Sequence, residues 1–319
     1  MIRRPTSSRG FVLVNALVLV AALAAVVVVL LQHSEGLRLR LMATQQAAQI
    51  EQYLDAFDAL ALHLLAGDVG GGADHLGESW ALELPPVTLD RGEVTGEIHD
   101  LQGRFNLNWL ANPEDTAASA AFDVLLTRLG LPVTQGDAIR AFLRPGGPQD
   151  KSAYAALEPA INPVGGAVLM PAQLRQMPGI RPAHYVRLAR HVAALPGDTL
   201  LNVNTATPEV LAAMLPAARP ALAGFLVQER QHTPFISRED IGERLLARFG
   251  ELALDGVDLE RFQAGSSWFG LTSSARFGSE TAANGAPDSA TARASRQAVI
   301  RRLGPPVGPQ LVWHLDFRE

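Results

Sequence analysis

One apolar segment near the N-terminus constrains this chain more than any other feature. From Phe11 to Leu31 the sequence reads FVLVNALVLVAALAAVVVVLL, and Asn15 is its single polar residue. A helix of this length spans about 30 Å, the thickness of the hydrocarbon core of a bilayer. Arg3, Arg4 and Arg9 precede it, and basic residues favour the cytoplasmic side of a membrane helix. We expect a single-pass helix with a cytoplasmic N-terminus and most of the chain across the membrane.

A cleaved secretory signal is the alternative explanation for this segment. Small residues lie at Ala21, Ala22, Ala24 and Ala25, but the apolar run continues past them to Leu31. That is longer than the hydrophobic region of an ordinary signal peptide, and no small-residue cleavage site follows the run. A retained membrane helix is therefore favoured.

The helical pattern continues beyond the membrane segment. Apolar residues recur at Ile50, Leu54, Phe57 and Leu60, which is the spacing of one helix face. Proline is absent from residues 11–65, and a glycine-rich stretch begins shortly afterwards. We predict one continuous helix of about 55 residues, roughly 80 Å long, whose second half packs on a domain outside the membrane.

Composition excludes several kinds of chemistry. The chain has a net charge of −5 and no cysteine. The charge argues against a nucleic-acid-binding protein that relies on bulk positive potential. The missing thiols exclude disulfide scaffolds, thiolate metal sites and cysteine nucleophiles.

The remainder of the chain changes from strand pattern to helix pattern and back. Alternating apolar residues predict short strands before a Gln102-Gly103 turn, which suits a hairpin, and again near the C-terminus. Asp100 and Arg104 are expected to close this turn rather than to perform chemistry. The predicted strands are 80–84, 87–89, 94–98, 267–272, 296–303 and 311–317; the predicted helices are 117–129, 134–143, 151–157, 171–177, 181–194, 207–214, 217–230 and 238–249. This order predicts an α+β fold, with the long N-terminal helix on an antiparallel sheet and a large all-helical insertion.

The start of the apolar segment carries a family resemblance. A basic leader ending Ser8-Arg9-Gly10, followed by Phe11 and an uninterrupted apolar helix, resembles the precursors of type IV pilins and pseudopilins. The resemblance implies that prepilin peptidase cleaves between Gly10 and Phe11, and that Phe11 is then N-methylated. Asn15 stands at the fifth mature position, a filament-core position where this class usually carries glutamate. The K subunit of type II secretion typically lacks that glutamate.

Two further motifs resemble the K pseudopilins (GspK family). They are DLQGRFNLN at Asp100–Asn108 and NVNTA at Asn202–Ala206. The second also resembles the lead-in of some DNA-binding hairpins. The resemblance to the K pseudopilins implies the following division of the chain: a prepilin leader (1–10), a transmembrane helix (11–31), the first part of a pilin-like domain (32–116), an all-helical insertion (117–261) and the C-terminal strands of the pilin-like domain (262–319).

Two alternatives remain open. Met170–Pro182 and Thr207–Pro220 each resemble a helix-hairpin-helix or SAM-like unit, which would fit a membrane-anchored DNA-binding or uptake protein. However, the turns lack the usual glycine pair, and basic and acidic side chains balance over residues 117–261. A membrane-anchored periplasmic hydrolase is the weaker alternative, because no zinc-protease, nucleophile-elbow or P-loop motif is present.

Calcium is a separate expectation. Some K pseudopilins bind calcium through loop oxygens, and Glu280, Asn284 and Asp288 offer such ligands in a polar loop over residues 278–293. Their spacing is not that of an EF-hand, and the same composition fits a solvated loop. No other cofactor is expected.

The resemblance therefore implies a minor pseudopilin rather than an enzyme. Its expected place is the tip of the periplasmic pseudopilus of a type II secretion system, with the helix held in the bacterial inner membrane. The implied role is to initiate the pseudopilus and support protein export across the outer membrane. The implied partners are the I- and J-type minor pseudopilins and prepilin peptidase, with no nucleic acid.

Overall fold

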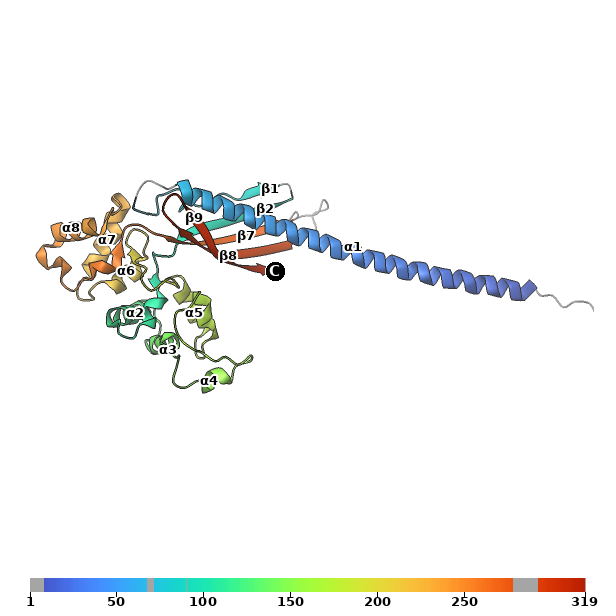
Figure 1. The fold of residues 1–319 in the computed structure, drawn as a ribbon, viewed down its shortest axis with the longest axis horizontal. Coiled ribbons are helices and arrows are strands. Elements are labelled where there is room, and N and C mark those ends of the chain that lie inside the picture. Colours follow the sequence, from blue (N-terminus) through green and yellow to red (C-terminus); the bar gives the residue numbers. More distant parts are fainter. Residues whose placement is uncertain (1–8, 68–71, 90, 278–291, 319) are drawn as a thin grey trace, which may run out of the picture.

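A single helix runs through and beyond the folded part of the molecule. The computed structural model describes residues 9–67, 72–89, 91–277 and 292–318. Helix α1 (Arg9–Gly67) has 59 residues, so it is about 90 Å long. Figure 1 shows that its N-terminal half extends away from the rest of the chain, while its C-terminal half lies along a sheet. The predicted continuous helix is thus present.

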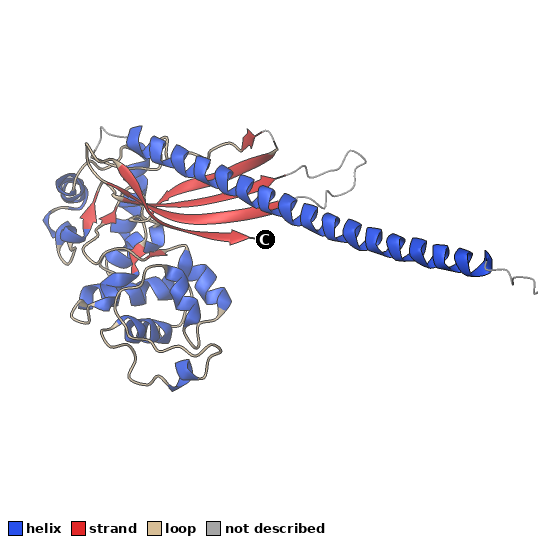
Figure 2. Ribbon diagram, turned by 45° about the vertical axis from the view of Figure 1, so that its right-hand side comes forward, coloured by secondary structure: helices blue, strands red, loops and turns tan. Residues whose placement is uncertain are grey.

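The sheet that receives α1 is antiparallel throughout. Its five strands follow the order β1-β2-β7-β8-β9, and α1 crosses one of its faces (Figure 2). The strands are β1 (Val87–Leu89), β2 (Gly92–Asp100), β7 (Trp268–Phe277), β8 (Ala292–Arg302) and β9 (Pro309–Arg318).

The helix and the sheet share one apolar core. Ile50, Leu54, Phe57, Ala61 and Leu65 of α1 are buried at helical spacing. They pack on the inner-face residues of the sheet, which include Val94, Ile98, Phe269, Leu271 and Ile300. Trp80 completes this core, and its ring lies 5.1 Å from that of Phe269 in an edge-to-face arrangement.

The chain between β2 and β7, Leu101–Ser267, forms a second module, which we call the insertion. It has its own core around Phe105, Phe122, Leu125, Leu211 and Phe235. Its helices are α2 (Thr116–Arg128), α3 (Thr134–Leu143), α4 (Ser152–Ala155), α5 (Pro182–Ala189), α6 (Pro208–Met214), α7 (Pro220–His232) and α8 (Arg238–Phe249), with 3-10 helices η1 (Leu107–Ala111), η2 (Pro171–Gln176), η3 (Glu251–Leu254) and η4 (Leu259–Arg261). Two short parallel strand pairs join β3 (Phe105–Asn106) to β4 (Val192–Ala193) and β5 (Leu201–Asn202) to β6 (Phe262–Gln263).

This architecture confirms the predicted α+β class, and α3 and α8 have the predicted bounds. The division of the chain into domains at residues 117 and 261 stays a prediction. The structure shows that the chain leaves the sheet after Asp100 and re-enters it at Trp268, where Asp100 is paired with Phe269.

Four local predictions are wrong. Residues 80–84 form no strand and begin in a turn, because Trp80 is drawn into the core while its indole Nε1 donates to Glu78 Oε2 at 2.7 Å. Gln102-Gly103 does not join a hairpin, since β3 pairs in parallel with β4 instead of with β2. The helix predicted from residue 171 is the 3-10 helix η2. The helix predicted over 181–194 ends at Ala189, because Val192 and Ala193 form β4.

Candidate functional site: the exposed helix and the polar junction

The N-terminal half of α1 is an unpacked apolar surface. Phe11 is 71% exposed, and the described side chains up to Gln45 are also exposed. The helix is long and apolar enough to cross a membrane. Gly10, Phe11 and Asn15 all lie on this projecting part, in the first turns of α1. An apolar surface of this extent requires either lipid or other helices around it.

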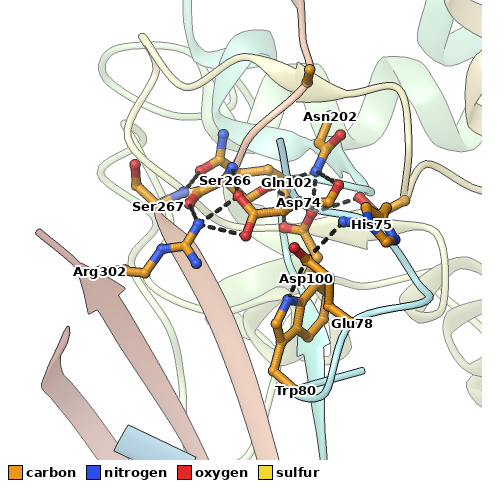
Figure 3. Close-up of polar contacts among 12 residues, drawn as sticks. Asp74, His75, Glu78, Trp80, Asp100, Gln102, Asn202, Ser266, Ser267 and Arg302 are labelled. Atoms are coloured by element: carbon orange, nitrogen blue, oxygen red, sulfur yellow. Dashed lines mark hydrogen bonds and ion pairs between the residues drawn. The ribbon is translucent and has the colours of Figure 1, made fainter. Parts of the chain in front are cut away.

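A buried polar junction lies at the end of the sheet away from the projecting half of α1, where the insertion leaves the sheet and returns to it (Figure 3). Asp100, the last residue of β2, is buried and accepts four hydrogen bonds. They come from Gln102 N at 2.7 Å, Asn202 Nδ2 at 3.0 Å, Thr205 Oγ1 at 2.5 Å and Ser266 Oγ at 2.6 Å. Burial raises the pKa of Asp100, and these donors oppose that rise. Asp100 therefore closes the turn, as predicted, and also binds both ends of the insertion.

Asp74 makes a second set of contacts in the same junction. Its carboxylate pairs with Arg302 of β8 and accepts from Ser266 N. Its backbone oxygen accepts from Asn202 Nδ2 at 3.0 Å. Arg302 also lies over the ring of Phe269, with its Cζ atom 4.9 Å from the centroid. Three distant chain segments are thus fixed to one another at one point.

Gln102 joins the turn to the returning strand. Its Oε1 atom accepts from Ser267 N at 2.6 Å and Trp268 N at 3.1 Å, while Nε2 donates to Leu200 O at 3.0 Å. Both the donor and the acceptor of this buried side-chain amide therefore have hydrogen-bond partners, as buried polar groups require.

Buried asparagines continue this pattern into the insertion. Asn108 donates to Val168 O at 3.0 Å and Leu195 O at 2.8 Å, and accepts from Val168 N at 2.8 Å. Asn204 forms the equivalent set with Phe235 N, Phe235 O and Ala264 O. These side chains replace strand pairing where the backbone is irregular.

Gly103 and Thr205 mark the place where the two motifs cross. A Cβ atom added to Gly103 would lie 2.8 Å from the backbone carbon and oxygen of Thr205. The glycine is needed because another segment of backbone passes directly over it. The DLQGRFNLN and NVNTA motifs therefore meet in space.

The polar groups of the junction hold distant chain segments together. Its serine, asparagine and glutamine groups are used in hydrogen bonds that join chain segments. Among the described residues no group of three or more histidine, aspartate or glutamate side chains could hold a metal ion. Glu280, Asn284 and Asp288, the predicted calcium ligands, lie outside the described residues.

Sequence reasoning singled out Asp100 but missed most of its neighbours. Asp74, Ser266 and Arg302 carry no local motif. Ser266 meets Asp100, and Asp74 meets Ser266 and Arg302, only because the insertion returns beside the end of β2. The sequence feature that came nearest to indicating this junction was the alternation of polar and apolar residues in DLQGRFNLN and NVNTA.

A long helix, bare in its first half and docked on an antiparallel sheet in its second, defines a pilin-like protein, here with a bulky insertion. Family models described as "Type II secretion system (T2SS), protein K" match residues 103–197 and 201–271. The type II secretion system protein K of Pseudomonas aeruginosa is 33% identical over 257 residues, covering 74% of this chain and 76% of that protein. The Aeromonas hydrophila protein of the same description is 31% identical over 229 residues, covering 63% of this chain and 69% of that protein.

The fold has a solved counterpart. A chain in the crystal structure of the GspK-GspI-GspJ complex from the enterotoxigenic Escherichia coli type 2 secretion system matches with a TM-score of 0.70 at 21% identity. The match covers 88% of this chain and 100% of that chain. The chain belongs to the type II secretion system protein K family, the K-type minor pseudopilins. The comparisons lend no support to the DNA-binding or hydrolase alternatives.

Proposed function

We propose that this minor pseudopilin occupies the tip of the periplasmic pseudopilus, where it initiates the filament and supports export across the outer membrane. The observation that carries this proposal is the placement of the two ends of the molecule. The apolar half of α1 projects from one end, while the insertion covers the other (Figure 1). A helix of this kind packs among other subunit helices, and a bulky insertion obstructs the addition of a further subunit above it.

Asn15 supports the same position. It lies in the exposed apolar part of α1, and an uncharged side chain there avoids the cost of a carboxylate without a partner in an apolar environment. A subunit with no neighbour ahead of it does not need that carboxylate. The role is one of assembly, without catalysis.

The proposed partners are the I- and J-type minor pseudopilins. The solved relative was crystallised in a complex of GspK, GspI and GspJ. Co-purification of the full chain from detergent-solubilised membranes tests this proposal. We expect I- and J-type subunits to be recovered together with the chain, and recovery of neither would contradict it.

Processing of the leader is the second part of the proposal. Prepilin peptidase would cleave between Gly10 and Phe11 and N-methylate Phe11, leaving α1 in the inner membrane with its N-terminus cytoplasmic before assembly. Intact-mass spectrometry of the chain, expressed with and without the peptidase, tests this. We expect loss of residues 1–10 plus one methyl group only when the peptidase is present. A Gly10→Val variant should remain full length, whereas Gly36→Val should be processed normally. Cleavage near Ala25 would contradict the proposal.

Calcium binding by Glu280, Asn284 and Asp288 stays a prediction. Isothermal titration of the full chain with calcium, repeated on a variant with alanine at all three positions, tests it. Equal calcium binding by both chains would exclude these ligands.

A further inference from the structure

A groove crosses the outer face of the sheet, the face opposite α1. One of its walls is formed by residues of β2, β7, β8 and β9, and the other by η2 and α5 of the insertion. Its volume is about 230 Å³. Because this strand-lined wall takes residues from four neighbouring strands, the groove runs across the strands rather than along them.

Arg104 lies at the β2 end of this groove. It lines the groove together with Glu97 and His99, and it is half-buried. Its guanidinium makes no hydrogen bond or ion pair with any other residue that the structure describes. Burial lowers the pKa of Arg104, while Asp100 and Glu97 oppose that shift.

Neither acid satisfies the donors of this guanidinium. The Asp100 carboxylate already accepts four hydrogen bonds from other groups, and Glu97 is exposed to solvent. A partly desolvated arginine with free donors is a strong binding group for a carboxylate, which it can engage through two parallel hydrogen bonds.

The other end of the groove is apolar and continues onto the surface. Trp313 of β9 lines the groove. In the register of β8 and β9, Val299 lies opposite Trp313, Gln297 opposite Leu315, and Ser295 opposite Phe317. Trp313, Leu315 and Phe317 therefore share the outer face, where Leu315 is 40% and Phe317 43% exposed. This apolar stripe extends beyond the reach of a small molecule and fits a protein segment.

The spacing of the two ends sets the length of the ligand. From β2 to β9 there are three strand spacings, or about 14 Å. An extended peptide advances about 3.3 Å per residue, so about four to five residues cross the groove.

We propose that this groove binds an extended segment of a partner protein, in which an acidic side chain meets Arg104 and an apolar residue about four positions away meets Trp313. Exposed apolar residues along β9 then receive the continuation of the segment. The inference concerns a surface on the outer face of the sheet and does not depend on the proposed tip position.

Calorimetric titration of the full chain in detergent with two peptides tests the proposal. The probes are Ac-Glu-Ser-Ala-Ser-Leu-NH2 and the same peptide with glutamine in place of glutamate. We expect the glutamate peptide to bind at least about tenfold more tightly, which is the size of a hydrogen-bonded charge interaction. Arg104→Gln should remove this difference and Arg104→Lys should keep part of it. Arg128→Gln, which changes an exposed arginine at the end of α2, should leave it intact, and Trp313→Ala should weaken both peptides.

Several results would overturn the proposal. They are equal binding of the two peptides to the unmodified chain, no binding of either, or undiminished discrimination in Arg104→Gln. If Arg104→Gln fails to fold, discrimination by the unmodified chain and its partial retention in Arg104→Lys decide the matter. Sodium acetate that binds as tightly as the glutamate peptide, and abolishes the peptide's heat of binding when added first, would indicate a small-anion site and overturn the protein-segment assignment.

Discussion

Arg296 of β8 and Asp58 of α1 form a buried ion pair, with Nη1 and Oδ2 2.7 Å apart. The side chains are 1% and 9% exposed. Arg296 also binds Asp55 of α1 at 2.7 Å and Asp316 of β9 at 2.6 Å. Burial raises the pKa of Asp58, and the contact with Arg296 opposes that rise. One cation thus joins α1 to two strands and sets the position of the helix along the sheet.

Replacement of Arg296 should destabilise the chain strongly. In Arg296→Met, Asp58 stays buried without its counter-ion, and we expect a loss of about 3–5 kcal/mol in the free energy of unfolding, measured by urea denaturation. Arg293→Met, at an exposed position on the same strand, should change stability little. The double variant Arg296→Met/Asp58→Leu should recover much of the loss, because no unpaired buried charge remains. A loss below that of the control would refute this account.

Gly103→Ala should disturb the crossing of the two motifs. The added methyl group would lie 2.8 Å from backbone atoms of Thr205, which cannot move without shifting the insertion. We expect a destabilisation of about 1–3 kcal/mol. Gly224→Ala is a matched control on α7, where nothing lies within 4 Å of the added atom. A Gly103→Ala chain as stable as that control would show that the crossing is not tight.

Asn108→Ala should loosen the interior of the insertion. It leaves Val168 N, Val168 O and Leu195 O without partners in a buried setting. The expected loss is on the order of 3 kcal/mol, with faster proteolysis of the loop between α4 and η2. Asn112→Ala removes only an exposed contact with Glu114 N and should have little effect on either measurement. Equal proteolysis rates in the two variants would contradict the prediction.

His99 should make the chain acid-sensitive. Burial lowers its pKa to about 3, whereas an unfolded histidine titrates near pH 6.5. Between these values the unfolded chain binds a proton that the folded chain does not, so stability is full above about pH 6.5 and falls as the pH is lowered. This one group adds a slope of up to about 1.4 kcal/mol per pH unit.

Unfolding free energies measured between about pH 6.5 and pH 5 check this slope. His99→Gln should have a shallower pH dependence than the unmodified chain. His63→Gln, at an exposed position on α1, should retain the original slope. Parallel curves for His99→Gln and the unmodified chain would contradict the prediction, because they would show that His99 binds protons equally in the folded and unfolded states.

The pattern of apolar and polar residues predicted correctly those helices that are stabilised by contacts between residues close in the sequence. Helix α8 begins and ends as predicted, because Ser237 caps it through Asp240 N and its apolar face has regular spacing. It was insufficient for residues 80–84, where alternation resembled a strand but Trp80 is needed in the core. The pairing of Phe105 with Val192 could not be predicted from the sequence pattern either, since it depends on how the insertion folds.

One part of the candidate site could likewise be predicted from the sequence, and the other part could not. The exposed apolar helix could be predicted from composition and spacing, and Phe11 and Asn15 were singled out by the resemblance to prepilins. The polar junction could not, because Asp74, Asp100 and Ser266 are far apart in the chain. Their meeting depends on tertiary structure, and the motif around Asp100 indicated a family without indicating what its side chains bind.

The return of the insertion beside its own exit has a mechanical consequence. A pull on the insertion acts on β2 and β7 at the same end of both strands, where Asp100 is paired with Phe269. Such a load would break the hydrogen bonds between β2 and β7 one residue pair after another, starting from this end. The bond from Ser266 to Asp100 lies beside that first pair and joins the two strands. Asp74 in turn holds Ser266 N and Arg302 of β8. These contacts resist the separation of β2 from β7. Tension on the insertion is therefore transmitted into the sheet and along α1.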